Sequence, residues 1–282
     1  MSVRKTIFDL ENKLDINKEF QQISNILFNN FYSVQFYNHR DLSFVDAMNE
    51  YFFPLWPYRD TFIDIYDYLK FIGVDSSIIS NYCDIDKDSF LYFLEFLVNI
   101  YNFTVKQIKE THFSYSIDRK VTACIANINT ILSKMHCKIL TQGDQSSIIK
   151  ANIDVDSVID SVPEDISDAL MNYCNFRIEN SITAKRQILK TIDLYIDKHK
   201  NELDKIDGVK NIRKDLDFVV NKLGINHSVD EHFSDLTNEE LLNYYDSCFV
   251  LMLDVLRRKK VHQIRANIST LKKKLEKENT KA

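Results

Sequence analysis

Apolar residues recur every three or four positions along most of the 282-residue chain, which is the spacing of amphipathic helices. The clearest examples run from Ser89 to Glu110 and from Ser116 to His136. In the second of these, one apolar stripe is formed by Ile125, Ile128, Ile131 and Leu132. We therefore expect two long helices here, and helix for more than about two-thirds of the chain.

The helical spacing continues after residue 160. It predicts four further helices, at about 163–179, 181–203, 207–223 and from 237 onward. Pro163 suits the first turn of a helix, and Gly208 and Gly224 lie where helices are expected to begin or end. Thr237 and Glu240 have the spacing of a capping box, so we expect the last helix to start there.

One segment departs from the helical pattern. Residues 137–151 contain two short β-prone runs on either side of the turn signal Gly143-Asp144, which predicts one small β-hairpin, and we expect strand to be confined to it. The expected fold is therefore all-α, with one small hairpin near 137–151 and a C-terminal helical bundle. The expected domains are an aromatic-rich helical domain at 1–136, the hairpin and connection at 137–160, and a second helical domain at 161–282.

Composition excludes several fold classes. The chain has only four Gly and three Pro, whereas Rossmann domains, P-loop proteins and β-rich folds need these residues in phosphate loops and tight turns. The five Cys are scattered and never form a CxxC pair, which argues against a disulfide framework and a structural zinc site. We interpret them as buried thiols of a cytoplasmic protein, and expect no cofactor.

No membrane segment is expected. The residues after Met1 contain no apolar h-region, so we expect no signal peptide. The most apolar stretch, Phe90 to Phe103, includes Glu95 and is too short to span a bilayer, so it is interpreted as a buried core helix.

Aromatic residues crowd the N-terminal half of the chain. They are Phe28, Phe31, Tyr32, Phe36, Tyr37, Tyr51, Phe52, Phe53, Trp56 and Tyr58. Their neighbours are mostly Asp, Glu and Asn rather than Lys and Arg, so we expect a packed core rather than a base-stacking surface. Pro54 and Pro57 should end the helix near Trp56.

Charge is distributed unevenly along the chain. Residues 257–282 contain ten Lys or Arg against two Glu, a formal charge of +8, which leaves −13 for the other 256 residues. Such asymmetry predicts either an anionic partner for the tail or a latch of the tail onto the acidic body. The candidate nucleic-acid contacts are Arg258, Lys259, Lys260, Arg265, Lys272, Lys273 and Lys274.

Within this basic segment, Arg257 is followed five residues later by His262. An Arg separated from a His by four to six residues is the catalytic pattern of HEPN ribonucleases. The order of an aromatic helical half, a small hairpin and a four-helix half resembles bacterial abortive-infection proteins with a C-terminal HEPN domain. Residues 181–196 resemble the first long helix of that domain, and residues 253–260 resemble the stretch that ends in its active-site Arg.

This resemblance implies a HEPN-like fold and a metal-independent site in which Arg257 grips the scissile phosphate of RNA. His262 would act as acid or base while the 2′-hydroxyl attacks. The family commonly has Asn, Asp or His after the Arg, where this chain has Arg258. In a continuous helix Arg257 and His262 would point about 140° apart, whereas Arg258 and His262 would share a face.

Two further patterns involve the C-terminal part. Val261, Ile264, Ile268, Leu271 and Leu275 follow one another at alternating steps of three and four residues. This seam is interpreted either as packing against the protein's own body or as the interface of a homodimer or a partner helix. His227-Ser-Val-Asp-Glu-His232 does not match the zincin patterns, so we interpret it as a polar loop and expect no metal site.

The preferred hypothesis is a cytoplasmic protein of the bacterial phage-defence type that binds RNA or a protein through an atypical HEPN-like domain. The first alternative is a metal-independent endoribonuclease that uses Arg257 and His262. The second is a regulatory or structural helical protein with no nucleic-acid role.

Overall fold

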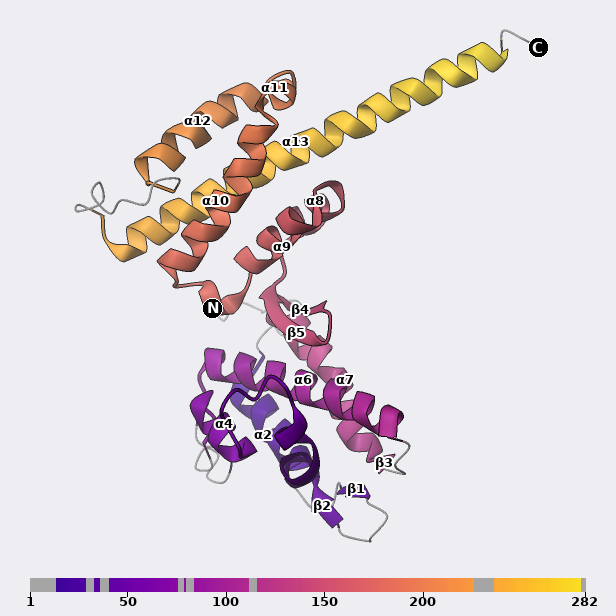
Figure 1. Cartoon of the computed structure of the whole chain (residues 1–282), viewed down its shortest axis with the longest axis vertical. Coiled ribbons are helices and arrows are strands. Elements are labelled where there is room, and N and C mark those ends of the chain that lie inside the picture. Colours follow the sequence, from indigo (N-terminus) through magenta and orange to yellow (C-terminus); the bar gives the residue numbers. More distant parts are fainter. Residues whose placement is uncertain are drawn as a thin grey trace, which may run out of the picture. The chain divides into compact units, whose positions relative to one another are not determined.

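A computed structural model of the chain describes residues 14–28, 33–35, 41–75, 79, 84–111, 116–225 and 236–279. Helix accounts for 74% and strand for 7%, which confirms the expected all-α class (Figure 1). The chain divides into two compact units, Met1–Ile148 and Ile149–Ala282, each of which is described by itself below.

The first unit is built on two long helices that the periodicity predicted. Its helices are α2 (Ile16–Leu27), α3 (Phe44–Ala47), α4 (Ile65–Phe71), α6 (Lys87–Thr111) and α7 (Arg119–Lys134). The stripe formed by Ile125, Ile128, Ile131 and Leu132 is buried, as is nearly every residue of α6 from Phe90 to Ile100. Among the described residues, no helix is both long and apolar enough to cross a bilayer.

Aromatic side chains form much of this core, as expected. Trp56 packs edge-on against Phe96 with ring centres 5.6 Å apart, and Phe20 packs against Phe93 at 5.2 Å. Phe52 and Phe53 are buried as well, whereas Tyr58 lies partly in solvent. The other expected core aromatics are either only partly buried or have side chains outside the described residues.

The helix before Trp56 ends where the two prolines require it. After α3 the backbone forms a π-helical turn at Met48–Phe52 and a 3-10 turn at Phe53–Leu55, and then becomes extended at Trp56, with φ −72° and ψ 119°. A residue that precedes proline is disfavoured in the helical region, so Pro57 accounts for the extended backbone of Trp56. The predicted break is confirmed.

Strand occurs in two places rather than one. The expected hairpin is formed by β4 (Cys137–Gln142) and β5 (Gln145–Lys150). A second sheet of order β2-β1-β3 pairs β1 (Ser33–Gln35) with β2 (Asp41–Ser43) and β3 (Ser116–Ile117), all antiparallel. The expectation that strand would be confined to 137–151 was therefore wrong, because strands of two or three residues are too short to show alternation.

Two polar side chains of α6 hold the hairpin. The buried Glu95 carboxylate accepts a hydrogen bond from the backbone N–H of Ile148 at 2.7 Å. The Asn99 amide accepts one from the N–H of Ser146 and donates one to its carbonyl oxygen, both at 2.7 Å. These bonds satisfy backbone groups of β5 that would otherwise be buried without partners.

The second unit is a helical bundle that ends in one very long helix. Its helices are α8 (Ile153–Val158), α9 (Glu164–Tyr173), α10 (Ile182–Lys198), α11 (Lys200–Leu203), α12 (Val209–Lys222) and α13 (Asn238–Asn279), with 3-10 turns at Ile159–Ser161 and Phe176–Ile178. Helices α8, α10 and α12 pack on α13, and α9 packs on α10. The four helices predicted after residue 160 are confirmed. Within the range predicted for the first, α9 is followed by the 3-10 turn at Phe176–Ile178, and within that for the second, α10 is followed by the short helix α11.

The predicted helix ends are also confirmed. Gly208 precedes α12 with a left-handed backbone, φ +76°, which glycine adopts without strain. At the start of α13 the Glu240 N–H donates to Thr237 Oγ1 at 3.2 Å, and the Thr237 N–H donates to Glu240 Oε2 at 2.8 Å. This reciprocal pair is the capping box.

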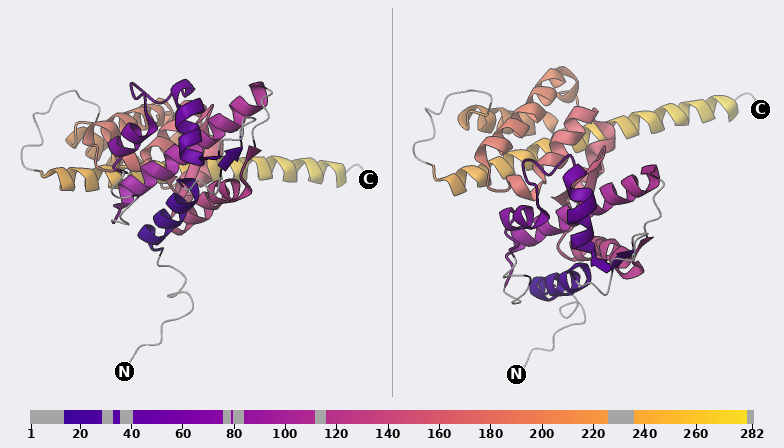
Figure 2. Two further views of the ribbon diagram at one scale, coloured as in Figure 1. Left: turned by 90° about the horizontal axis from the view of Figure 1, so that it is seen from below. Right: turned by 60° about the horizontal axis from the view of Figure 1, so that its bottom comes forward.

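Helix α13 is continuous over 42 residues, but only its first half belongs to the bundle. Tyr245, Cys248, Met252 and Val255 are buried among the other helices. From Val261 to Lys274, every side chain is exposed, and this segment extends beyond the other helices of its unit (Figures 1 and 2). The described helices of its own unit do not cover the seam, so the interpretation that the seam packs against that unit was wrong. A latch of the tail onto the first unit stays a prediction.

We expect Ile192→Ala in α10 to lower the free energy of unfolding by about 2–5 kcal/mol, because it leaves a cavity in the core of the second unit. Ile192 is 0% exposed, whereas Ile153 in the same unit is 85% exposed and supplies a matched control. Ile153→Ala should change stability by no more than about 0.5 kcal/mol. Urea denaturation followed by circular dichroism measures both, and equal losses would contradict the packing described.

Candidate nucleic-acid interface

A hollow of about 440 Å³ lies where α13 leaves the bundle. Its walls come from α13 and from the turn between α11 and α12. It is lined by Ile206, Asp207, Asp254, Arg257, Arg258, Val261, His262 and Arg265. Three guanidinium groups and one imidazole therefore border a single concavity that also contains two carboxylates.

Arg257 and His262 border this same hollow although they lie five residues apart on a continuous helix. Arg258, Val261 and Arg265 occupy the helix face between them, so the two residues stand at opposite edges of the concavity. Their shared hollow is compatible with one ligand contacting both.

Among the cations of the hollow, Arg258 has its side chain fixed by an ion pair on its own helix and by packing over a glycine. Its Nε donates to Asp254 Oδ2 at 3.1 Å, one turn earlier on α13. Its guanidinium also lies over Gly208, where an added Cβ would stand 2.9 Å from Nη1. Gly208 is thus suited to its left-handed backbone, and its lack of a side chain leaves room for the Arg258 guanidinium.

The other charged groups of the hollow are freer. Arg257 Nη1 lies 3.5 Å from Asp154 Oδ1, but both side chains are more than half exposed, so this ion pair contributes little to stability. The side chains of His262 and Arg265 are exposed and make no hydrogen bond or ion pair within the described part of the chain. They can turn toward a ligand without breaking an existing contact.

Lys259 and Lys260 face the protein instead of solvent. The Lys259 side chain is only 8% exposed, and its Nζ donates to Tyr195 Oη at 3.1 Å and lies 3.8 Å from Glu202 Oε2. Lys260 Nζ donates to the backbone carbonyl of Ser157 at 2.6 Å. We therefore remove both from the set of residues expected to contact phosphate.

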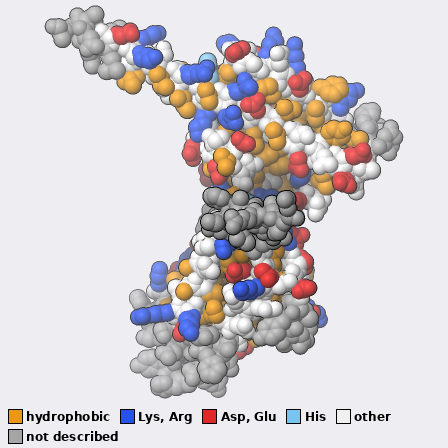
Figure 3. Space-filling model, turned by 180° about the vertical axis from the view of Figure 1, so that it is seen from behind, with side chains coloured by type: hydrophobic (Ala, Val, Ile, Leu, Met, Phe, Trp, Pro, Cys, Tyr) orange, Lys and Arg blue, Asp and Glu red, His pale blue; other side chains and the backbone are white. Residues whose placement is uncertain are grey.

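The remaining candidates form an exposed row. Arg258, Arg265 and Lys272 follow one another at intervals of seven residues, so they lie along one side of α13. Lys273 and Lys274 are exposed beyond them. Blue and orange side chains lie beside each other along the projecting part of α13 (Figure 3).

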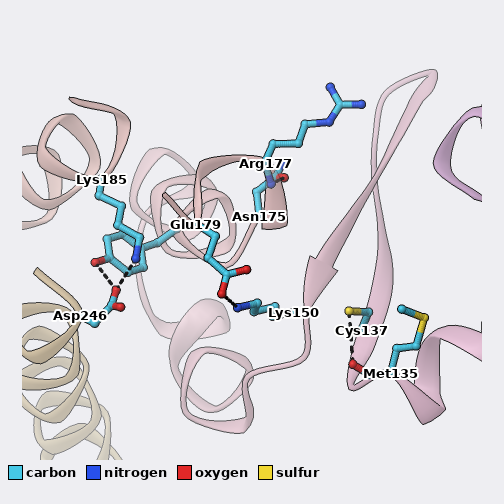
Figure 4. Close-up of polar contacts among 9 residues, drawn as sticks. Met135, Cys137, Lys150, Asn175, Arg177, Glu179, Lys185 and Asp246 are labelled. Carbon is cyan, nitrogen blue, oxygen red and sulfur yellow. Dashed lines mark hydrogen bonds and ion pairs between the residues drawn. The ribbon is translucent and has the colours of Figure 1, made fainter. Parts of the chain in front are cut away.

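A second polar cluster of this unit was not anticipated from the sequence. The buried Lys185 on α10 donates to Asp246 Oδ1 on α13 at 2.6 Å, as Figure 4 shows, and Tyr173 Oη donates to the same oxygen at 2.8 Å. Burial, and then the Asp246 charge, raise the pKa of Tyr173 far above its usual value. The cluster borders a pocket of about 310 Å³, at whose edge Lys150 pairs with Glu179.

A signal for these buried cations does exist in the sequence. Lys185 stands four residues before Leu189 and seven before Ile192, on the apolar face of α10. Lys259 likewise follows Leu256 by three residues and Val255 by four, on the buried face of α13. A Lys in register with an apolar stripe predicts an internally paired side chain, and counting it as surface charge overlooks this.

We expect Lys259→Ala to lower the free energy of unfolding by about 1–3 kcal/mol. The substitution removes the buried aliphatic part of the side chain and the ammonium group that donates a hydrogen bond to Tyr195 Oη. Lys273→Ala is the matched control, since that side chain is exposed, and it should change stability by less than about 0.5 kcal/mol. Thermal denaturation of the two variants would show the difference. Similar melting temperatures would mean that the Lys259 contact contributes nothing.

The arrangement offers anion binding and proton transfer. Guanidinium groups bind phosphate through paired N–H donors, and a neutral or protonated imidazole can take up or release a proton near neutral pH. Within the described residues, no group of three or more His, Cys, Asp or Glu is placed to hold a metal ion, and His227 and His232 lie outside them. No protein-family model, no curated protein and no solved structure matches the chain.

Proposed function

We propose that the protein binds single-stranded RNA through the hollow and the exposed row of cations on α13. The observation that carries this proposal is that Arg257, Arg258, His262 and Arg265 line one concavity. The resemblance in sequence supports a role of the abortive-infection type in a bacterial cytoplasm, with the second unit as an atypical HEPN-like domain. RNA as the ligand and a role of the abortive-infection type are both parts of this proposal.

Charge supports an anionic polymer as the ligand. The segment 257–282 has a formal charge of +8 within a chain whose net charge is −5, so the attractive potential is local to α13. A polyanion would approach this end and would be repelled by the acidic remainder. Binding through such a segment concentrates the nucleic acid at the hollow.

The recognised part of the RNA would be its backbone. No Phe, Tyr or Trp is among the described residues that line the hollow, and its polar groups are the guanidinium, imidazole and carboxylate groups of its lining. Phosphate contacts fix position without reading the base, so binding should depend little on sequence. A flexible single strand can follow a concave wall, whereas a duplex presents its phosphates along a rigid surface.

The salt dependence of RNA binding tests this proposal. Each phosphate contact on single-stranded nucleic acid contributes about 0.7 to the slope of log affinity against log salt. Replacing Arg258, Arg265 and Lys272 by Gln should therefore lower that slope by about 2 and weaken binding equally for all sequences. Fluorescence anisotropy with labelled RNA of several sequences at a series of salt concentrations measures both.

A matched control removes the same charge elsewhere in the unit. Lys190, Lys198 and Lys214 are exposed on α10 and α12, away from the hollow, and their replacement by Gln should leave the slope nearly unchanged. If the two triple variants changed the slope equally, RNA affinity would depend on net charge alone and not on the row of cations on α13. An unchanged affinity in the first variant would refute the proposed site.

A second candidate function is metal-independent RNA cleavage. The specific observation in its favour is that Arg257 and His262 border the same hollow and that the imidazole is exposed. Arg257 would hold the scissile phosphate while the 2′-oxygen attacks phosphorus and the bond to the 5′-oxygen breaks. His262 would transfer a proton, either from the 2′-hydroxyl or to the departing 5′-oxygen.

If this second function holds, the purified protein should cleave single-stranded RNA in the presence of EDTA. Arg257→Ala and His262→Ala should each reduce the rate by about a hundredfold or more, and the double variant should be no worse than either one, because the residues act as a unit. Gel analysis of a labelled RNA measures the rates, with Lys190→Ala on α10 as control, since that side chain is exposed and does not line the hollow. Cleavage that survives both substitutions would exclude this site, and binding without cleavage would leave the first proposal alone.

A further inference from the structure

The projecting part of α13 presents an apolar line that the described residues of its own unit leave uncovered. Val261, Ile264, Ile268 and Leu271 are between 43% and 55% exposed. They follow one another at steps of three, four and three residues, so they lie along one side of the helix. Four branched apolar side chains aligned in solvent are typical of a surface that packs against a partner.

The spacing identifies the shape of that partner. Two core positions in every seven residues give the narrow seam of a coiled coil, which takes one facing helix, with side chains inserted between those of its neighbour. A helix that lies on a membrane instead has a broad apolar face that usually includes Trp or Phe. Residues 261–274 contain no Trp, Phe or Tyr, so a helix fits this seam better than a lipid surface.

The charged residues beside the seam are all cations. Arg258, Arg265 and Lys272 line one side of it. On the other side Lys274 is exposed and Asn267 is neutral, while the ammonium group of Lys260 is bonded to the Ser157 carbonyl. In a two-helix coil the flanking positions of one helix meet those of the other. A second copy of this chain would bring only further cations and Asn267 to these flanking positions, and no carboxylate, which argues against the homodimer considered from the sequence.

We propose that this seam is the docking site for an acidic amphipathic helix of another protein. The partner would carry apolar residues at two positions in seven, and Glu or Asp at the positions that flank them. Its carboxylates would face the row of Arg258, Arg265 and Lys272, where guanidinium groups can bind carboxylate through paired donors. This inference goes beyond RNA binding, because it depends on the apolar seam, which RNA does not use.

Docking would have a consequence for the hollow. Arg258 and Arg265 belong both to the flank of the seam and to the lining of the hollow. An acidic helix seated on the seam would therefore compete with an anionic ligand for the same two side chains. The partner would act as a switch on the hollow without touching His262.

Two designed peptides test the proposal on the full-length protein. Both are helices of three heptads with Ile and Leu at the core positions, one with Glu and the other with Lys at the flanking positions. Fluorescence anisotropy should show that the Glu peptide binds, and that the Lys peptide binds at least about tenfold more weakly. The double substitution Ile264→Ser with Ile268→Ser should abolish binding of the Glu peptide.

A matched control separates the seam from general surface hydrophobicity. Ile153 and Leu194 are 85% and 57% exposed elsewhere in the second unit, so Ile153→Ser with Leu194→Ser removes comparable apolar surface. This control should leave peptide affinity unchanged. Because all four substituted side chains are exposed, we expect both variants to keep the circular dichroism spectrum of the original protein.

Other occupants of the seam would give distinct results. Equal binding of the Glu and Lys peptides, or no binding of either, would overturn the proposal. A dimer seen by light scattering that dissociates with Ile264→Ser and Ile268→Ser would assign the seam to a second copy. Sedimentation with vesicles rich in anionic phosphatidylglycerol, lost in the same variant while neither peptide binds, would assign it to a membrane. RNA affinity should survive in this variant, so failure of the seam and failure of the RNA site are distinguishable.

Discussion

Two buried cations determine how α10 and α13 lie against each other. Lys185 on α10 reaches Asp246 near the start of α13, and Lys259 on α13 reaches Tyr195 further along α10. The partners occur in the same order on both helices, so the two contacts fix direction and register together. Slipping α13 by one turn would leave both ammonium groups buried without partners, which typically costs several kcal/mol.

The hollow depends on this register. Because Lys259 points inward, the neighbouring face of α13, with Arg258, His262 and Arg265, is turned outward at the turn that contains Gly208. Arg213 adds a third buried cation on α12, where its Nη1 donates to Asp204 at 2.7 Å and holds the segment between α11 and α12 in place. Cations inside the bundle therefore position the cations that line its surface.

Sequence patterns predicted the parts of this structure that are set locally. Capping by Thr237 and Glu240, the extended backbone of Trp56 before Pro57 and the left-handed turn at Gly208 each arise from a few adjacent residues. The strands β1 to β3 were missed because two or three residues are too few to show alternation, and because β3 joins the sheet by pairing distant residues, Ile117 with Val34. Periodicity also showed that one side of α13 is apolar, but it could not show that Ile264 and Ile268 would remain uncovered, since coverage depends on where other elements pack. For the candidate site, the sequence located a run of cations on α13. It could not show that Lys259 points inward, because that depends on where Tyr195 of α10 lies.

The unbroken course of α13 gives the bundle a mechanical connection to its far end. Helix propagates without a new nucleation step once the buried half has folded, so the exposed residues remain helical as an extension of that half. The part beyond residue 260 is about 28 Å long at 1.5 Å per residue. Such a rod behaves as a lever arm whose fulcrum lies near Lys259. A tilt of about 10° at the fulcrum would displace the tip by about 5 Å, so a load taken up at the tip is transmitted as torque to the contacts that hold α13 in the bundle.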